Sequence, residues 1–390
     1  MGNVKGVVAT GQQIGAGWSP ALSVVKALAA LAESKRRGLR AVYWLADEDH
    51  DRMEVASVTA LQGARLIQHR FEFSAPQGTA TGWLEWTSRH QAEAEGLWGK
   101  LPCPTEPTLR GHAIALGRPL WEREITPYSP TKDADRTAIQ GELERWRGLE
   151  LEDDLNKQAA LLETKGEKLV LDPRTQSAWF SLNPVTGARS RLEAGQPCPK
   201  GHWLSPGAAL RPLMQSLLLP VEAVVLGPAE RAYWKLLESV WGRVGLNAPQ
   251  ILPRPTVFVL DGSAPNISVG ELEALKLGQW EAFAPVAQKK PSEMQFPEPD
   301  PSWPSAISKR FLSEVGRTKL RMARLDKRLE KEAAGKKVGG DVEKLRQMLF
   351  PFNKPQERVL PGWQWLQNDA LLDSIEKALE GRESVYLVRA

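Results

Sequence analysis

Cysteine and long apolar runs are scarce in this sequence of 390 residues. Only two cysteines occur, Cys103 and Cys198, which argues against the disulfide framework of a small secreted domain. No run of about 18 apolar residues is present, so no membrane-spanning helix is predicted. The opening residues, MGNVKGVVATG, also lack the apolar core of a secretory signal. From these absences we expect a cytoplasmic protein without a membrane partner.

A strong overall charge is absent as well, because the net charge is only +4. The basic residues gather in residues 305–350, which carry 13 Lys and Arg against 6 Asp and Glu. No aromatic interleaving or known nucleic-acid-binding motif accompanies them. We therefore interpret this segment as a solvated helix surface and expect no nucleic-acid partner.

The spacing of a metal site is missing too. Cys103 with His112, and Cys198 with His202, could in principle supply zinc ligands, but both cysteines lie in proline-containing loops and the spacing fits no known finger. We predict no metal ligands, and whether a metal is required stays open.

What the sequence does contain is an alternation of strands and helices. A β-branched run at 7–9 ends at Gly11, Ser19 and Pro20 suit the N-cap and first residue of a helix that closes at Gly38, and residues 39–46 form a continuous apolar stretch. Such a stretch is typical of a parallel strand covered on both faces. A helix to about residue 217, a strand at 223–226, a helix at 228–244 and the run QILPRPTVFVL repeat the alternation. We predict an α/β fold with a Rossmann-like parallel sheet.

The remaining segments suggest three parts. Residues 1–284 form the predicted Rossmann-like core, with a helical and loop insertion around 75–165. In the less regular middle of the chain, ARLIQHRFEF and EKLVLDP are predicted strands and ADRTAIQGELERWRG a helix. Residues 285–304 are rich in proline and predict a linker.

The third part, residues 305–390, is predicted to hold a coiled-coil hairpin and a C-terminal segment. Apolar residues recur at alternating spacings of four and three from Phe311 to Leu329 and again from Val338 to Leu349. This seam could pack within the chain or form a homodimer.

The first candidate binding element follows the first strand, in the stretch TGQQIGAG. Its loop contains Thr10, Gly11, Gln12, Gln13 and Gly15. A glycine-containing loop before a helix offers backbone N–H groups, and the glutamines add neutral donors, which together suit an anionic oxygen. The spacing matches neither the Walker loop nor the dinucleotide fingerprint. A tight structural turn is the competing interpretation.

The second candidate is EDHD, in which Glu48, Asp49, His50 and Asp51 follow the second strand. Ligands of open parallel sheets bind beyond the carboxyl ends of the strands, which places this cluster beside the first loop. Three carboxylates around an imidazole can hold a cation or act as a general base. A polar helix N-terminus is the simpler alternative.

Two further stretches, LRPLMQ and GPAERAYW, and the PRP motif add polar residues near the next strands. Function and packing explain them about equally well, although Arg211 and Gln215 are expected one helical turn apart and could bind an anion together. The candidate binding residues here are Arg211, Gln215, Gly227, Glu230, Tyr233 and Arg254.

Five ordered motifs together resemble the cysteine ligases of bacillithiol biosynthesis, the BshC family. They are TGQQIGAGWSPALSVVK, VYWLADEDHD, LRPLMQSLLLPVEAVVLGPAERAYW, PQILPRP and LFPFNKPQERVL. This chain is shorter than usual for that family, and Ser19 stands where the family usually has glycine. The resemblance implies a nucleotidylyl-transferase-like Rossmann core and a coiled-coil region used for dimerisation.

The resemblance also implies the reaction, which joins L-cysteine to glucosaminyl malate by an amide bond. The candidate residues would then form opposite walls of one pocket, with Asp49, His50 or Asp51 as catalytic groups and the others binding substrate. Activation of a free carboxylate suggests ATP as a co-substrate. A non-catalytic binding paralogue and a metal-dependent hydrolase that uses the EDHD cluster are the competing hypotheses.

Overall fold

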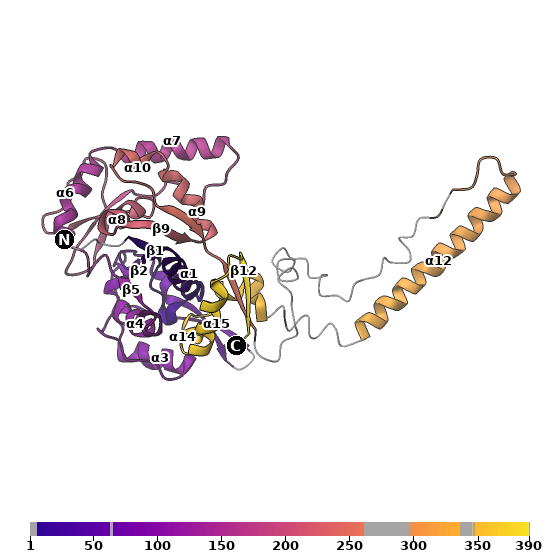
Figure 1. Ribbon diagram of the computed structural model, residues 1–390, viewed down its shortest axis with the longest axis horizontal. Helices are drawn as coiled ribbons and strands as arrows, with labels where there is room; N and C mark the ends of the chain where they lie inside the picture. The colour runs from indigo at the N-terminus through magenta and orange to yellow at the C-terminus, as the bar shows by residue number, and fades with distance from the viewer. Residues whose placement is uncertain are drawn as a thin grey trace. The chain divides into compact units, whose positions relative to one another are not determined.

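The computed structural model describes residues 6–62, 65–260, 296, 298–335, 345 and 348–389. The chain divides into two units, one made of residues 1–262 with 354–390 and the other of residues 263–353. Figure 1 labels the elements along the chain. Within the described residues, no helix combines the length and the apolar character that a membrane span needs.

A five-stranded parallel sheet forms the centre of the first unit, with the strand order β10-β9-β1-β2-β5. Its strands are β1 (Val7–Gln12), β2 (Arg40–Leu45), β5 (Ile125–Tyr128), β9 (Val221–Leu226) and β10 (Gln250–Pro253). This sheet confirms the predicted α/β fold. The 75–165 segment, however, contributes the edge strand β5 and is therefore not a simple insertion outside the sheet.

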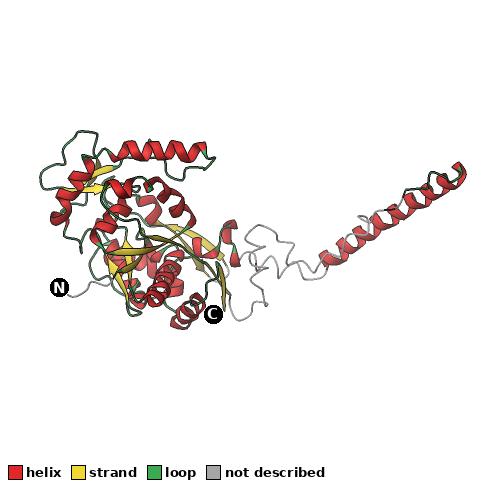
Figure 2. Cartoon of the chain, turned by 45° about the horizontal axis from the view of Figure 1, so that its top comes forward, coloured by secondary structure: helices red, strands yellow, loops and turns green. Residues whose placement is uncertain are grey.

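Both faces of the sheet are covered by helices, as Figure 2 shows. Alternate residues of β2 and the position after it belong to different apolar clusters: Tyr43 and Leu45 pack with residues of α1, while Trp44 and Ala46 belong to the other cluster. Successive side chains of a strand point to opposite faces, so an unbroken apolar run is what a doubly covered strand requires.

The helix α1 (Leu22–Arg37) connects β1 with β2. It ends where Gly38 adopts the left-handed conformation at φ 66°, and Lys35, Arg36 and Arg37 fill its last turn, where cations favour the helix dipole. Its start differs from the prediction, because Ala21 is the N-cap residue and Ser19 provides no cap; the Ser19–Pro20 peptide bond is cis.

The middle of the chain adds shorter elements. The helices are α2 (Arg52–Ala56), α3 (Ser88–Trp98), α4 (Leu109–Leu116), α5 (Arg118–Trp121), α6 (Arg136–Arg147) and α7 (Leu151–Thr164), with the 3₁₀ turns η1 (Ala16–Trp18) and η2 (Thr81–Trp83). The antiparallel pairs are β3 (Ser57–Gln62) with β4 (Arg65–Arg70), and β6 (Trp179–Leu182) with β7 (Arg189–Arg191) and β8 (Trp203–Pro206).

Two predictions for local structure are wrong. EKLVLDP forms no strand. The single helix predicted at 228–244 is divided into α9 (Pro228–Trp234), the 3₁₀ turn η3 (Lys235–Leu237) and α10 (Val240–Arg243), and Leu236, Leu237 and Trp241 of this stretch are buried. The preceding helix is α8 (Arg211–Leu218), near its predicted end.

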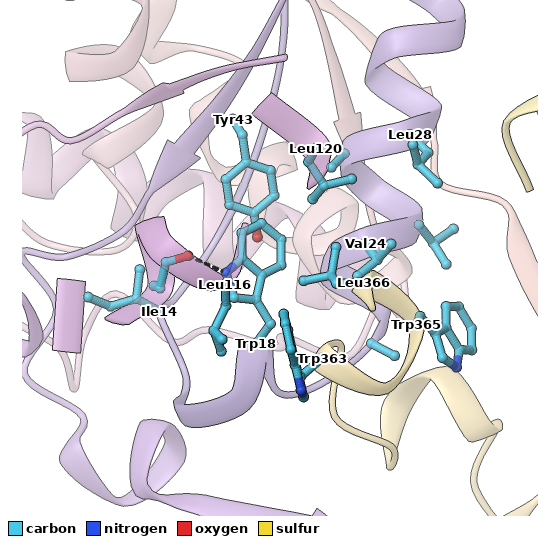
Figure 3. Close-up of a cluster of buried hydrophobic side chains, with 14 of the residues drawn as sticks. Ile14, Trp18, Val24, Leu28, Tyr43, Leu116, Leu120, Trp363, Trp365 and Leu366 are labelled. Atoms are coloured by element: carbon cyan, nitrogen blue, oxygen red, sulfur yellow. Dashed lines mark hydrogen bonds between the residues drawn. The ribbon is translucent and has the colours of Figure 1, made fainter. Parts of the chain in front are cut away.

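The C-terminal residues 354–390 fold with the central sheet's unit and not with the predicted hairpin. They contain η7 (Gln356–Arg358), α14 (Trp363–Leu366), α15 (Asp369–Leu379) and β12 (Val385–Arg389), which pairs in parallel with β11 (Thr256–Leu260). The apolar side chains of α14 and α15 join the cluster around α1 and Trp18. Figure 3 shows Trp363, Trp365 and Leu366 of α14 in this cluster. Burial of this apolar surface explains why the predicted domain boundary fails.

In the second unit, the structure describes a helix α12 (Ser305–Gly335) and a turn η6 (Pro351–Asn353). The helix agrees with the first arm of the predicted hairpin. Most of the second arm and most of the proline-rich 285–304 segment lie outside the described residues.

Candidate active site

A cavity of about 620 Å³ lies at the carboxyl ends of β1, β2, β9 and β10. The register of the sheet creates it, because the β1 and β2 ends are level: Gln12 pairs with Leu45, and Ala46 N donates to Gln12 O at 3.0 Å. Most of the predicted site residues line this cavity. They are Thr10, Gly11, Gln12, Gln13, Asp49, Arg211, Gln215, Gly227, Glu230, Tyr233 and Arg254.

Asp49 projects into the cavity and pairs with Arg211, whose Nη1 lies 3.0 Å from Asp49 Oδ2. Burial alone would raise the pKa of this carboxyl, but the charges of Arg211 and Arg189 and hydrogen bonds from Gln13 and Arg211 hold it far below its usual range. Asp49 is thus ionised at any working pH. It suits an orienting or binding role better than the predicted role of general base.

His50 does not line the cavity. Its Nδ1 lies 2.9 Å from Arg189 Nη1, and its ring stands over Phe180. A guanidinium can only donate, so Nδ1 must accept and the ring proton belongs on Nε2. Burial and the charge of Arg189 lower the pKa of His50. The geometry therefore contradicts the prediction that this imidazole removes a proton from a substrate in the cavity.

The remaining residues of the acidic cluster point away from the cavity. Glu48 is fully buried in an ion pair with Arg136, and Asp51 caps α2 by accepting from Glu54 N at 3.1 Å. Gly15 lies before η1, where its carbonyl accepts from Trp18 N at 3.1 Å. Four consecutive side chains leave one short loop in different directions, so only Asp49 of the cluster reaches the cavity.

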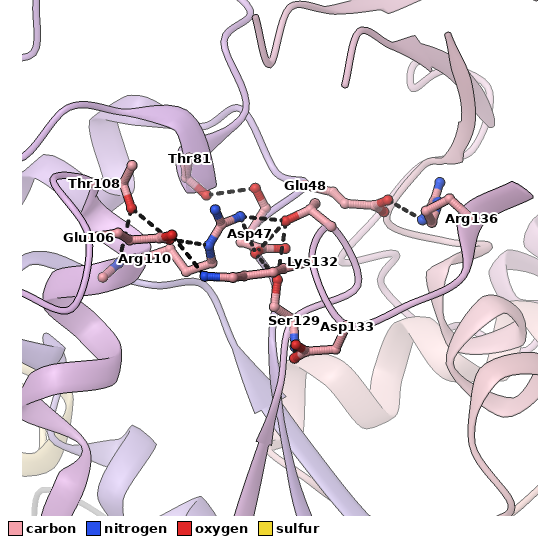
Figure 4. Close-up of polar contacts among 12 residues, drawn as sticks. Asp47, Glu48, Thr81, Glu106, Thr108, Arg110, Ser129, Lys132, Asp133 and Arg136 are labelled. Atoms are coloured by element: carbon pink, nitrogen blue, oxygen red, sulfur yellow. Dashed lines mark hydrogen bonds and ion pairs between the residues drawn. The ribbon is translucent and has the colours of Figure 1, made fainter. Parts of the chain in front are cut away.

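The acidic loop is fixed from behind by a buried network around Asp47 (Figure 4). Asp47 Oδ2 accepts from Ser129 at 2.6 Å and from Thr131 at 2.7 Å, and Arg110 lies 3.4 Å away. Burial raises the pKa of Asp47 to about 6 despite these bonds. Asp47 and Glu48 bind arginines from separate elements, which leaves the next residue, Asp49, at the cavity.

Lys26 is a polar residue of this region that the helical pattern of α1 conceals. Its Nζ contacts Gly11 O, lies 3.0 Å from Gln12 Oε1 and 2.7 Å from Glu230 Oε1, and the side chain is fully buried. Burial lowers the pKa of Lys26. A lone lysine between Val25 and Ala27 was the signal that could have revealed it.

Glu230 connects Lys26 to the start of α9, which forms another wall of the cavity. Its Oε2 accepts from Gly227 N at 2.8 Å, so one carboxylate binds both the start of α9 and Lys26. A Cβ at Gly227 would lie 3.2 Å from Glu230 Oε2, so a side chain there would require a small shift of this carboxylate. Tyr233 lies one turn along α9, and burial raises the pKa of its hydroxyl.

The C-terminal segment supplies a further wall of the cavity, which the predictions did not include. Glu357 is fully buried, pairs with Arg254 at 2.5 Å and accepts from Val257 N at 3.0 Å. This anchor brings Lys354 and Arg358 to the cavity. Within the described part of the chain, neither side chain has a hydrogen-bond or ion-pair partner. LFPFNKPQERVL contains both residues, but their position depends on a contact across about 100 residues of sequence.

Within the described ranges, no group of three His, Cys, Asp or Glu side chains is placed to hold a metal ion. Glu48 and Asp49, the core of the proposed hydrolase site, bind separate arginines instead.

Comparison with known proteins identifies the relatives of this chain. Residues 196–255 match the family model "Bacillithiol biosynthesis BshC, N-terminal Rossmann-like domain". A protein of Thermus thermophilus named "Putative cysteine ligase BshC" is 28% identical over 98% of this chain and 88% of its own length. The chain is a relative of the BshC proteins. The identically named protein of Salinibacter ruber is 26% identical over 67% of this chain and 55% of its own length. The predicted resemblance to BshC is thus confirmed.

Proposed function

We propose that this relative of BshC is a ligase of bacillithiol biosynthesis that joins L-cysteine to glucosaminyl malate. The observation that carries the proposal is the single cavity at the carboxyl edge of the parallel sheet, where charged residues from four separate chain segments meet. The names of its relatives point to a cysteine ligase and the family model to bacillithiol biosynthesis, the acceptor substrate is the one that the family resemblance implies, and the cavity supports this reaction chemically.

The walls of the cavity offer suitable partners for both ends of such a substrate. A malate group carries two carboxylates, and Lys354 and Arg358 are cations that form no ion pair within the described residues. The sugar amine needs acceptors, which Gln13, Asp49 and Glu54 provide. Ligand sites typically enclose several hundred cubic ångströms with a few polar groups that fix orientation.

ATP is proposed as the co-substrate because a free carboxylate does not acylate an amine without activation. The loop after β1 has no Walker spacing, and the two unpaired cations would suit a phosphate or a carboxylate. The nucleotide therefore enters the proposal through the chemistry of amide formation.

The proposal is tested with the purified full-length chain, L-cysteine, glucosaminyl malate and ATP, with the thiol product detected by mass. We expect product in the complete mixture, none without ATP, and a loss of at least tenfold in kcat/KM for Arg211→Lys, because lysine has a different shape and would lose the contact of Arg211 Nη1 with Asp49 Oδ2. Arg174→Lys is the matched control, because Arg174 forms an exposed ion pair with Asp172. Ligand binding without product would favour the non-catalytic alternative.

The proposal extends to a homodimer through α12. Phe311, Val315 and Met322 recur along this helix at coiled-coil spacing. Light scattering of the full chain tests this part separately.

A further inference from the structure

We propose that Glu54 is the general base that takes the proton from the acceptor amine, with Gln13 Oε1 accepting a remaining N–H of the same nitrogen. This inference rests on the proposed ligase function. It assigns a catalytic residue that lies three positions beyond the acidic cluster, on α2.

The other carboxylates of the cavity are already bound to cations. Asp49 binds Arg211 at 3.0 Å, and Glu230 binds Lys26 at 2.7 Å and Gly227 N at 2.8 Å. Glu54 also lines the cavity, but within the described residues its carboxylate has no cation or hydrogen-bond donor. A carboxylate already bound to a cation is a weak base, so Glu54 is the acid of this cavity that is available to take up a proton.

The groups that face Glu54 favour proton uptake. Partial desolvation at the cavity wall and the nearby charges of Asp51 and Asp49 raise the pKa of Glu54, while the residue as a whole remains exposed to solvent. The neighbouring cation on α2, Arg52, points elsewhere, since its Nη1 donates to Phe73 O at 3.2 Å and Ala75 O at 2.6 Å. The same negative charges attract an ammonium group to this side of the cavity.

Gln13 provides the second acceptor at this position. Its side chain lies close enough to Asp49 to lower the pKa of that carboxyl, and because an ionised carboxylate can only accept, the Gln13 amide must turn its NH₂ group toward Asp49. Gln13 Oε1 is buried and has no partner within the described residues. This carbonyl oxygen therefore has no protein partner in the described part of the chain, and a rotation of the Gln13 side chain would bring it to a ligand in the cavity.

The order of the strands separates the carboxylates Glu54 and Asp49 from the cation Arg358 at the other side of the cavity. Glu54 and Asp49 follow β2, whereas Arg358 lies next to Glu357, which binds Arg254 at the end of β10. Strands β9 and β1 lie between them, so the two sides are about 14 Å apart at three interstrand spacings. Because the amine and the carboxylates of glucosaminyl malate are only a few bonds apart, the side chains of both sides would reach inward from their strand ends to hold such a substrate in a single direction.

The substrate ammonium transfers one proton to Glu54, and the freed nitrogen pair attacks the carbonyl carbon of cysteine that ATP has activated as a mixed anhydride with phosphate. The new C–N bond forms, the C–O bond to phosphate breaks, and its electron pair leaves with the phosphate. The second nitrogen proton passes to the departing phosphate, and Glu54 releases its proton to solvent.

Binding measurements with a matched pair of ligands test the charge contact. Glucosaminyl malate carries the ammonium, and its N-acetylated form lacks it. By calorimetry, Glu54→Gln should weaken binding of the amine about tenfold and leave the acetylated ligand within about twofold. Glu122→Gln on α5, an exposed carboxylate outside the cavity, should change neither affinity. An equal loss for both ligands, or no loss for either, would overturn the assignment.

Catalysis with two nucleophiles tests the proton transfer. With glucosaminyl malate, Glu54→Gln should lose at least a hundredfold in kcat, together with the acidic limb of the pH profile. Hydroxylamine is unprotonated at neutral pH, so cysteine hydroxamate formation should stay within about threefold of the wild type. If the variant loses both reactions equally, Glu54 is not the base. If the wild-type protein neither binds nor converts glucosaminyl malate, the proposed function itself is rejected.

Discussion

At the scale of single residues, the fixed charges around the cavity determine which hydrogen-bonding atoms remain for a ligand. Lys26 can only donate, so it occupies Gln12 Oε1 at 3.0 Å and leaves the Gln12 NH₂ group available. Asp49 can only accept, so it leaves the Gln13 carbonyl available. Among the described residues, Gln12 therefore has hydrogen-bond donors without a partner, whereas Gln13 has an acceptor without one. The QQ pattern alone indicates donors and acceptors but not which glutamine supplies which.

The same reasoning applies to His112, a fully buried histidine whose ring stacks on Trp86 at 3.7 Å. Its Nε2 accepts from Gly17 N at 3.3 Å and so helps to position η1 after the glutamine loop. Burial lowers the pKa of His112 to about 3. The protein thus contains a neutral imidazole directly behind the proposed binding loop.

The pKa of His112 predicts a specific dependence of stability on pH. In the unfolded chain a histidine binds a proton near pH 6.5, whereas the folded protein resists protonation down to about pH 3. Unfolding takes up a proton in this window, so the free energy of unfolding should fall by about 1.4 kcal/mol per pH unit as the pH decreases below 6.5. Urea unfolding between pH 7 and pH 4 measures the slope.

The His112→Leu variant should lose this contribution to the slope, although its stability at pH 7 will also be lower. His69→Gln is the matched control, because the His69 side chain is 31% exposed on β4 and should leave the His112 slope in place. Identical slopes for the wild type and His112→Leu would show that this imidazole does not titrate as proposed.

At the scale of elements, the ends of four parallel strands create the cavity, and the C-terminal segment completes it. The segment is attached to the start of α1 by backbone bonds, since Ala21 N donates to Leu360 O at 2.7 Å and Gly362 N donates to Trp18 O at 3.0 Å. Trp18 also donates through Nε1 to Ala113 O at 2.6 Å, so α4 joins the same contact. Local distortion here would move Arg358 as well as η1.

Gly362 is the position at which this contact is most sensitive to side-chain size. A Cβ there would lie 2.5 Å from Trp18 O and 2.9 Å from Trp18 Cβ. We expect Gly362→Ala to lower the free energy of unfolding by about 1–3 kcal/mol, because the backbone of one of the two elements must move. It should also weaken ligand binding through Arg358. Denaturant unfolding and calorimetry measure the two effects.

Gly242→Ala provides the control for Gly362→Ala. Gly242 lies in α10, and nothing lies within 4 Å of an added Cβ. Alanine in a helix with open space should be neutral or slightly stabilising. If both variants unfold at the same denaturant concentration, the close contact between Gly362 and Trp18 does not limit stability.

At the scale of the whole molecule, the predictions succeed where the signal is local. The 39–46 stretch predicts β2 because a nearly unbroken apolar run suits a strand between two helical layers, and the positions of Asp49 and Gln13 then follow from the rule for strand ends. The roles within EDHD fail because they depend on partners such as Arg189 and Arg136, which lie far along the chain.

The C-terminal segment shows the same limit at larger scale. Its apolar residues at 371, 372 and 375 have helical spacing that suits either a coiled coil or a globular core. Only the long-range pairing of β12 with β11 and the Glu357–Arg254 contact assign it to the sheet. Sequence periodicity carries no information about which partner covers an apolar face.

This division of the chain predicts that the first unit folds without residues 263–353. Gln356 Nε2 donates to Val259 O at 2.9 Å, so the two chain ends at the junction lie close together. A linker of about eight Gly and Ser residues spans roughly 15 Å and should connect them without strain. We expect this variant to unfold cooperatively, with a Tm within about 5 °C of the full chain and ligand affinity within about threefold.

If α12 forms the dimer interface, the variant in which the linker replaces residues 263–353 should be a monomer by light scattering. The matched control removes residues 354–390 instead, which takes away Glu357 and the apolar face of α15. That truncation should aggregate or lack a cooperative transition, because the cluster around α1 loses its cover and Arg254 loses its buried partner. If the linker variant fails to fold while the truncation succeeds, the cavity depends on the helical unit and not on the C-terminal segment.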